Sequence, residues 1–308
     1  MHYKLRHKAI VRSPKRFILP LLAVVVGLSF GGGLAYYAPL QSKAAPVKAS
    51  PRSAGKVSTA STTIPITAPL ANQQPTPSAP KPPVAAVASP APWVPARVLD
   101  LTNWYLGLPT GKDDDPDSIL QPQLARYETK PWFYVNDAKD GVVFAANVGG
   151  ATTDGSMYPR SELREMKGSA KASWDGNVGT HVMEITQAIT KTPPVKPDVI
   201  AGQIHGTDDD VMQIHLSGTK LCVKYDDGNK SVDIDPNYVL GTKFTVKIQS
   251  SGGHVKVWYN GQQKADLAIN SATSYFKAGA YVNSNPTKGD KPDAVGEVII
   301  YSLQVSHT

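Results

Sequence analysis

The distribution of charged residues is the feature that most restricts what this chain can fold into. Residues 1–97 carry 12 Lys and Arg side chains and no Asp or Glu, whereas residues 98–308 carry the other 20 basic and all 25 acidic side chains. The net charge of +7 therefore belongs to the N-terminal part, and residues 98–308 have a net charge of −5. We expect no nucleic-acid partner, and a polyanionic ligand has to bind a local basic site on an acidic domain.

Residues 1–40 have the pattern of an export signal. Six basic side chains precede residues 17–40, which contain no charged side chain. As a helix, these residues span about 36 Å, which is enough for the hydrocarbon core of a bilayer. This length favours an uncleaved transmembrane anchor over a cleaved signal peptide. The basic flank should stay in the cytoplasm, so we expect the rest of the chain to be extracellular or at the cell surface, either tethered or secreted after cleavage.

Residues 41–97 are expected to form a disordered linker. Residues 41–95 hold 12 of the 26 prolines, many Ala, Ser and Thr residues, and no acidic residue. Such a segment buries too little apolar surface to offset the loss of chain entropy on folding. It is either a plain tether or a spacer that carries the folded domain through a cell-surface layer.

Residues 98–308 are predicted to be a single all-β domain, a sandwich or jelly roll. Short β-branched and aromatic runs alternate with Gly, Asn, Asp and Pro, and no amphipathic helix of normal length is evident. Asn260-Gly261 is a strong hairpin signal, because both residues tolerate positive φ. The predicted strands are Val142–Val148, His181–Thr186, Val199–His205, Val211–Leu216, Leu221–Tyr225, Phe244–Gln249, His254–Tyr259, Tyr275–Tyr281 and Glu297–Val305.

Three segments have a polar face when they are drawn as strands, since residues two apart share a face. The residues on these faces are Arg160, Glu162 and Arg164; Gln203 and His205; and Lys277, Gly279 and Tyr281. Together they would form a groove with guanidinium groups for carboxylates, an amide, an imidazole, a phenol, and a glycine that leaves room for a ligand. Each segment alone is more typical of a solvated surface. A second Gln-Ile-His at 213–215 shows how little that tripeptide proves.

From Val98 to Thr308 the sequence resembles the alginate lyases of polysaccharide lyase family 7. The resemblance rests on Tyr158–Met166, Ala201–His205 and Tyr275–Tyr281, which occur in the family's order and spacing. Gly202 before the glutamine selects Gln203 and His205 over Gln213 and His215, so the second histidine is expected to be structural. The resemblance also implies that Gln-Ile-His, as opposed to Gln-Val-His, favours guluronate-containing blocks.

The resemblance implies a β-jelly roll whose concave sheet binds the polymer. The implied catalytic residues are Arg160, Gln203, His205 and Tyr281, and the implied substrate-binding residues are Glu162, Arg164, Lys277 and Asn283. One difference follows the tyrosine, where Val282-Asn283-Ser284 stands in place of the family's common Asn-Gln-Ser. Subsite contacts or linkage preference are expected to differ as a result.

The implied reaction is β-elimination from alginate, whose hardest step is removal of the proton at C5 beside the uronate carboxylate. Arg160 and Gln203 are candidates to stabilise that carboxylate, and Tyr281 with His205 to supply base and acid. We expect endo action on guluronate-containing blocks and unsaturated 4-deoxy-hex-4-enuronosyl ends. No cofactor or metal is expected, and the triplets 113–115 and 208–210 are interpreted as solvated loop acids.

Three other functions are alternatives to this one. A hydrolase would use Glu162 and Glu165 as a carboxylate pair, but residues three apart on a strand face opposite sides. A non-catalytic lectin would bind acidic polysaccharide without cutting it. A lyase for another polyuronate, such as polyglucuronate, would share the same chemistry. A monomer is expected.

Overall fold

Alternation of apolar and polar residues along short strands produces two stacked antiparallel sheets in this protein. The computed structural model describes residues 92–207 and 209–308. The leader and most of the linker predicted above therefore lie outside the described residues. Within the described ranges, no helix has the length and apolar character that crossing a membrane requires.

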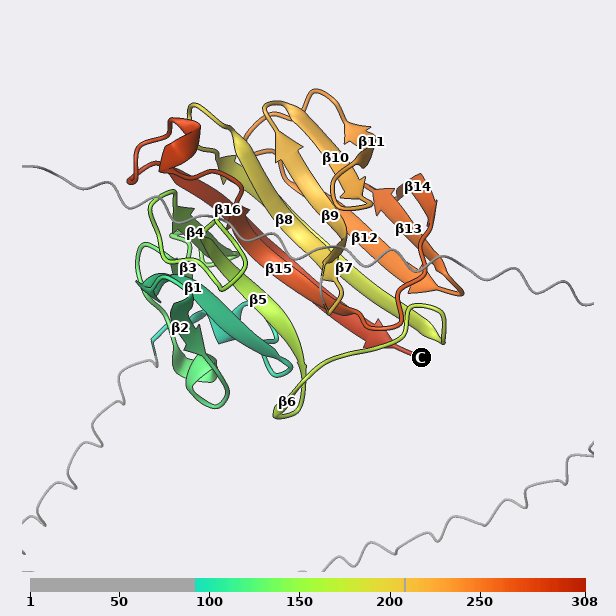
Figure 1. Cartoon of the computed structure of the whole chain (residues 1–308). Helices are drawn as coiled ribbons and strands as arrows, with labels where there is room; N and C mark the ends of the chain where they lie inside the picture. Colours follow the sequence, from blue (N-terminus) through green and yellow to red (C-terminus); the bar gives the residue numbers. More distant parts are fainter. Residues whose placement is uncertain (1–91, 208) are drawn as a thin grey trace, which may run out of the picture. The chain divides into compact units, whose positions relative to one another are not determined.

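One sheet has nine strands and the other seven among the described residues, and the strands within each sheet pair in antiparallel fashion. The nine-stranded sheet has the order β11 (Lys230–Asp235), β10 (Lys220–Tyr225), β9 (Asp210–Ser217), β8 (Asp198–His205), β15 (Tyr275–Val282), β5 (Arg160–Lys167), β1 (Trp104–Lys112) and β2 (Asp115–Ile119), with β6 (Ala170–Lys171) paired to β5. The seven-stranded sheet has the order β14 (Gln262–Ala268), β13 (His254–Tyr259), β12 (Phe244–Ser251), β7 (Thr180–Lys191), β16 (Val295–His307), β4 (Val142–Asn147) and β3 (Phe133–Val135). Figure 1 shows β5, β15 and β8 side by side.

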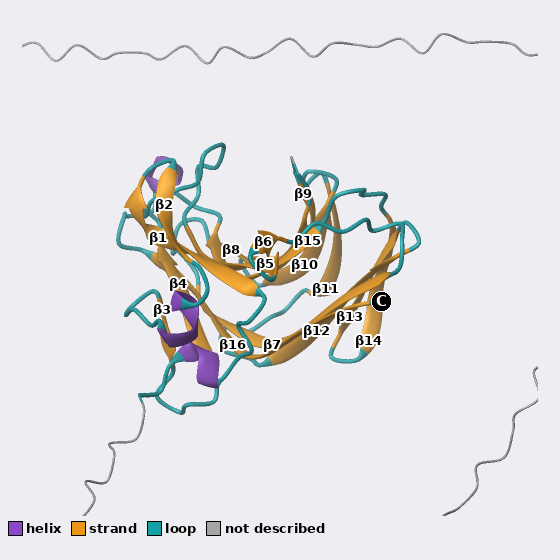
Figure 2. Cartoon of the chain, turned by 90° about the horizontal axis from the view of Figure 1, so that it is seen from below, coloured by secondary structure: helices purple, strands orange, loops and turns teal. Residues whose placement is uncertain are grey.

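The nine-stranded sheet is curved. Figure 2 shows β1 and β2 on one side of the curve, β9 and β10 on the other, and β5, β8 and β15 between them. The seven-stranded sheet lies against its convex face. Short 3-10 helices occur at Pro95–Arg97, Gln123–Arg126 and Pro286–Lys288. The prediction of an all-β sandwich is confirmed.

The space between the sheets is filled by apolar side chains from both. Phe133, Phe144, Phe244 and Phe276 are among the largest fully buried side chains, and burying each contributes about 1.5–3 kcal/mol. The central strands of the nine-stranded sheet contribute residues such as Leu163 on β5, Ile204 on β8 and Ala278 on β15 to the same core. Because side chains alternate along a strand, the residues next to these three face the concave side.

All nine predicted strands are present, with ends that differ by a few residues, and the segment from Arg160 to Arg164 that is drawn as a strand above lies in β5. The Asn260-Gly261 turn is confirmed, with φ of 49° and 81° at its two residues. The sequence does not predict β1, β2, β3, β6, β11 or β14. Gly107 and Pro109 interrupt the alternation of β1, and the other five are short or rich in polar residues.

Gly279, in the middle of β15, is required for a reason other than room for a ligand. Its φ is +143°, a conformation that residues with a side chain disfavour. A Cβ at this position would lie 2.4 Å from the Ser161 carbonyl oxygen and 2.8 Å from Glu162 Cα, both in the backbone of β5. The glycine thus permits β15 to approach β5 where the two strands carry the polar face.

Gly279→Ala is expected to lower the free energy of unfolding by about 3 kcal/mol or more, because a strained backbone and a clash with β5 add together. Gly218→Ala is the matched control, since Gly218 also has positive φ (+63°) but an added Cβ would have no atom within 4 Å; it should cost about 1 kcal/mol. Urea denaturation of the full chain measures both. Equal losses in the two variants would contradict the clash.

Candidate active site

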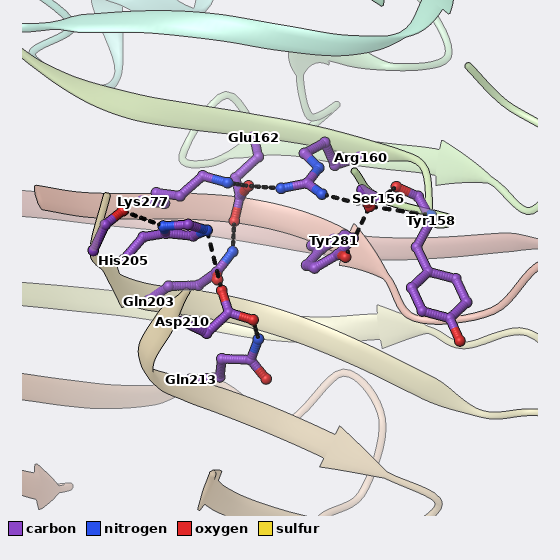
Figure 3. Close-up of polar contacts among 11 residues, drawn as sticks. Ser156, Tyr158, Arg160, Glu162, Gln203, His205, Asp210, Gln213, Lys277 and Tyr281 are labelled. Carbon is purple, nitrogen blue, oxygen red and sulfur yellow. Dashed lines mark hydrogen bonds and ion pairs between the residues drawn. The ribbon is translucent and has the colours of Figure 1, made fainter. Parts of the chain in front are cut away.

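The register of three neighbouring strands brings the predicted polar faces together. β15 pairs with β5 on one side and β8 on the other. The paired positions are Lys277 with Arg164 and Gln203, Gly279 with Glu162, Tyr281 with Arg160, and Tyr275 with His205. The prediction that these faces line one sheet is confirmed, and Figure 3 shows the side chains converging.

Glu162 is the centre of the cluster and is only 2% exposed. Its carboxylate lies 2.6 Å from Lys277 Nζ and 3.6 Å from Arg160, and it accepts a 2.5 Å hydrogen bond from Gln203 Nε2. Burial alone would raise the pKa of Glu162, but the charges of Lys277 and Arg160 and these hydrogen bonds outweigh it and hold the pKa below its usual range. The carboxylate is therefore ionised and engaged by the site's own cations.

Lys277 is buried beside this carboxylate. Burial and the nearby charge of Arg160 outweigh the attraction of Glu162 and lower the pKa of Lys277 to about 8. The ammonium group is thus charged at neutral pH and begins to lose its proton in mildly alkaline solution.

Gln203 is fully buried beneath the concave surface. An amide nitrogen has two N–H donors, and one of them is used by Glu162. No hydrogen-bond partner is present for Gln203 Oε1 among the described residues. One donor and one acceptor of this amide are therefore uncommitted.

Arg160 lies over Tyr281, with its guanidinium carbon 3.8 Å from the ring centroid. Ser156, in the loop before β5, connects the two: its Oγ accepts a 2.9 Å hydrogen bond from Arg160 and lies 3.1 Å from the Tyr281 hydroxyl. Burial raises the pKa of Tyr281, and Arg160 and Ser156 offset only part of that effect. Tyr281 is therefore protonated at neutral pH and is a proton donor.

His205 ends β8 at the other end of the cluster. Its ring stacks on Tyr275, with centroids 5.2 Å apart, and its Nδ1 lies 2.7 Å from the Gly206 carbonyl oxygen. Burial, followed by the charge of Lys277, lowers the pKa of His205. The imidazole is therefore neutral near pH 7 and is able to accept a proton.

The other two predicted substrate-binding residues, Arg164 and Asn283, are also engaged by the protein itself. The Arg164 guanidinium donates to the carbonyl oxygens of Glu165 and Ala172, at 2.6 and 3.0 Å, and covers the Tyr275 ring at 3.9 Å. Asn283 lies just beyond β15, where Lys196 Nζ donates to its carbonyl oxygen and to its Oδ1. Arg164 thus supports Tyr275, and Asn283 sits at the margin of the site.

Glu162 and Glu165 do not form the carboxylate pair that the hydrolase alternative requires. Glu162 faces the concave side, whereas Glu165 faces the opposite side, where it accepts hydrogen bonds from Trp174 Nε1 and the Phe276 amide and pairs with His307. Within residues 92–207 and 209–308, no group of three His, Cys, Asp or Glu side chains is arranged to hold a metal ion.

Two residues of the site are not found by sequence reasoning. Ser156 comes from an irregular loop, where no periodicity reports which side chains point inward. The prediction that residues 208–210 are solvated loop acids is wrong for Asp210. It is the first residue of β9, and its Oδ1 lies 3.4 Å from His205 Nε2. The pairing of β8 with β9 places it there.

A curved antiparallel sheet that presents cations, an amide, a neutral imidazole and a phenol has the groups that a lyase of acidic polysaccharides requires. The family model described as alginate lyase matches residues 99–307. The chain therefore belongs to the alginate lyases of polysaccharide lyase family 7, and it is a polysaccharide lyase.

Similar proteins agree with this membership. Alginate lyase AlgAT5 of family 7 is 52% identical to this chain, with a TM-score of 0.68. The match covers 70% of this chain and 99% of the AlgAT5 chain. An alginate lyase of Klebsiella pneumoniae is 25% identical over 69% of this chain and 91% of its own. The family 7 alginate lyase A1-II′, solved with product GGG, is 28% identical, with a TM-score of 0.61 over 70% of this chain and 99% of its own.

Replacing Glu162 by Gln is expected to lower the free energy of unfolding by about 3–5 kcal/mol, because the buried Lys277 charge loses its compensation. Adding Lys277→Met should recover part of that loss, since the double variant has no uncompensated ammonium group at this position. Urea denaturation of the two single variants and the double variant measures the coupling. Losses that simply add would show that the pair is not coupled.

Substrate affinity is expected to weaken as the pH rises through about 8, because Lys277 loses its positive charge there. Initial rates between about pH 7 and 9.5, at constant ionic strength, should show KM rising as the ammonium group is deprotonated. Lys277→Arg is the control, since arginine stays charged throughout. The same rise in KM in this variant would assign the titration to another group.

Proposed function

We propose that this alginate lyase cuts within guluronate-containing blocks by β-elimination, leaving unsaturated 4-deoxy-hex-4-enuronosyl non-reducing ends. The observation that carries the proposal is the presence on one concave face of His205 and Tyr281, both of which burial favours in the neutral form. Burial lowers the pKa of His205 and raises the pKa of Tyr281, which supports separate roles for them as base and acid.

The chemistry begins at C5, whose proton becomes acidic only when the adjacent carboxylate is neutralised. Arg160 is the candidate for that contact because its guanidinium lies over Tyr281 and its Nε is buried with no partner among the described residues. The second amide N–H of Gln203 is a further donor. Both would stabilise the charge that spreads into the carboxylate as the proton leaves.

The positions of base and acid bear on the preferred uronate. In mannuronate the C5 proton and the O4 leaving group lie on the same face, so a single ionised tyrosine would serve as both base and acid. In guluronate they require two groups. A protonated Tyr281 and a neutral His205 suit the second case, with His205 as base and Tyr281 as the acid that protonates O4.

Three further points support this reading. The A1-II′ lyase has been solved with the product GGG and with the substrate GGMG, in which G units predominate; we take these as guluronate. The middle residue of Gln203-Ile204-His205 is isoleucine, the form that implies a preference for guluronate blocks. The curvature of the nine-stranded sheet supports endo action, because a long chain can lie across a concave face and be cut internally.

The place of action is part of the proposal. The basic flank and uncharged stretch of residues 1–40 support export, and the Pro-rich residues 41–97 support a tether between membrane and lyase domain. The enzyme would then meet polymeric alginate outside the cell.

Absorbance of the new C4–C5 double bond tests the activity directly. The purified full chain should give a rising ultraviolet signal with polyguluronate, a slower one with polymannuronate, and none with polyglucuronate. Tyr281→Phe and His205→Asn should each lower kcat by about 10²-fold or more, because each removes a proton-transfer group.

Val239→Ala is the control variant, since Val239 is exposed and is not part of the concave cluster. Faster cleavage of polymannuronate than of polyguluronate would reject the guluronate preference. A flat trace with every polymer, from folded protein that still binds alginate, would leave a lectin. Early release of short products without a fall in viscosity would reject endo action.

A further inference from the structure

Asp210 occupies the space next to the base nitrogen of His205. In the neutral imidazole one nitrogen carries a proton and the other a lone pair. Because a carbonyl oxygen only accepts, the 2.7 Å contact with Gly206 places the proton on Nδ1. The lone pair is therefore on Nε2, which lies 3.4 Å from Asp210 Oδ1.

The second Gln-Ile-His motif explains how Asp210 is held. Gln213 lies on β9, directly opposite Gln203 of the first motif. Its Nε2 donates a hydrogen bond to Asp210 Oδ2, which leaves Oδ1 facing the imidazole. Figure 3 shows the chain of contacts from Gln213 through Asp210 to His205. Gln213 is itself buried, so its side chain holds the carboxylate in one orientation.

We propose that Asp210, oriented by Gln213, is a positioning residue for His205 in the elimination step. The inference rests on the proposed role of His205 as base. The C5–H bond breaks and its proton moves to Nε2; the electron pair forms the C4–C5 double bond; the C4–O4 bond breaks and O4 takes the proton of Tyr281. The carboxylate of Asp210 stabilises the imidazolium that this step creates.

The charges around His205 decide what Asp210 contributes. Lys277 on β15 disfavours the imidazolium, as does burial, whereas Asp210 on β9, Glu162 on β5 and the Gly206 carbonyl favour it. Glu162 is already engaged by Lys277. Asp210 is thus the carboxylate that directly faces the nitrogen receiving the proton.

The side chain of Asp210 is itself affected by burial, which raises its pKa, while His205 and Lys277 oppose that rise. Asp210 and His205 therefore compete for protons as the solution becomes acidic. The free enzyme is active when Asp210 is ionised and His205 is neutral. Because the two groups interact, they titrate as a unit.

The pH dependence of kcat/KM in the full chain separates this role from a structural one. Asp210→Asn removes a negative charge beside His205, so the pKa of the imidazole falls and the acidic limb moves to lower pH. The kcat should fall by about tenfold, which is less than the full contribution of general base catalysis because His205 itself is still present. Asp210→Glu keeps the negative charge, so the acidic limb of its kcat/KM profile should lie at the same pH as in the unmodified enzyme.

Gln213→Leu tests the orientation independently. This variant should also have a lower kcat. The double variant Asp210→Asn with Gln213→Leu should be no slower than Asp210→Asn alone, because both substitutions act through the contact between Asp210 and His205. Asp209→Asn is the matched control: this exposed neighbour loses the same charge away from the imidazole and should leave kcat and the acidic limb unchanged.

Three outcomes would overturn the inference. A lower kcat with an unmoved acidic limb would mean that Asp210 only supports the fold. A lower KM with unchanged kcat would mean that its charge only repels the polymer. An acidic limb that moves equally in Asp209→Asn would mean that any lost surface charge shifts the pH profile. Activity retained in His205→Asn would instead reject the proposed base, and with it the proposed function.

Discussion

The buried carboxylate of Glu162 is the interaction on which the site depends. It neutralises Lys277, lies next to Arg160 and holds the amide of Gln203, and these four residues come from three different strands. Without it, two cations would face each other in an interior of low dielectric constant. With it, the cations are fixed in place before any polymer arrives. Positive charge is thereby preorganised on a domain whose overall charge is negative.

From this centre the two ends of the cluster acquire different chemistry. At one end Tyr281 is covered by Arg160 and keeps its proton. At the other, His205 is stacked on Tyr275, which the Arg164 guanidinium also covers. Tyr281 is therefore a proton donor, and His205 is a proton acceptor. Burial favours the neutral form of both side chains, so one sheet holds a protonated phenol and a neutral imidazole at neutral pH.

The sandwich, ten of its strands and the residues on the concave face could be predicted from the sequence, because strand alternation reports directly on which side chains share a face. Alternation does not distinguish which of those residues are free to meet a ligand. Arg164 and Glu162 have equivalent places in the pattern, yet the first is bonded to backbone carbonyls and the second to other side chains. Ser156 and Asp210 depend on loop geometry and strand register, for which a single sequence carries no signal. Asp210 in particular belongs to a run of three acids that is typical of a solvated turn.

The strand order of the nine-stranded sheet has a consequence for how the enzyme is made. Among the strands that carry the site, β8 and β9 are neighbours both in sequence and in space, whereas β5 pairs with β15 although more than a hundred residues separate them. Closing so long a loop is slow, and proteins with such distant pairings have high contact order. The catalytic constellation consequently exists only after one of the last strands of the chain has joined the sheet. A chain synthesised only as far as β14 contains β5, β8 and β9 but lacks β15, the strand that lies between β8 and β5, so the site cannot assemble before β15 has been made.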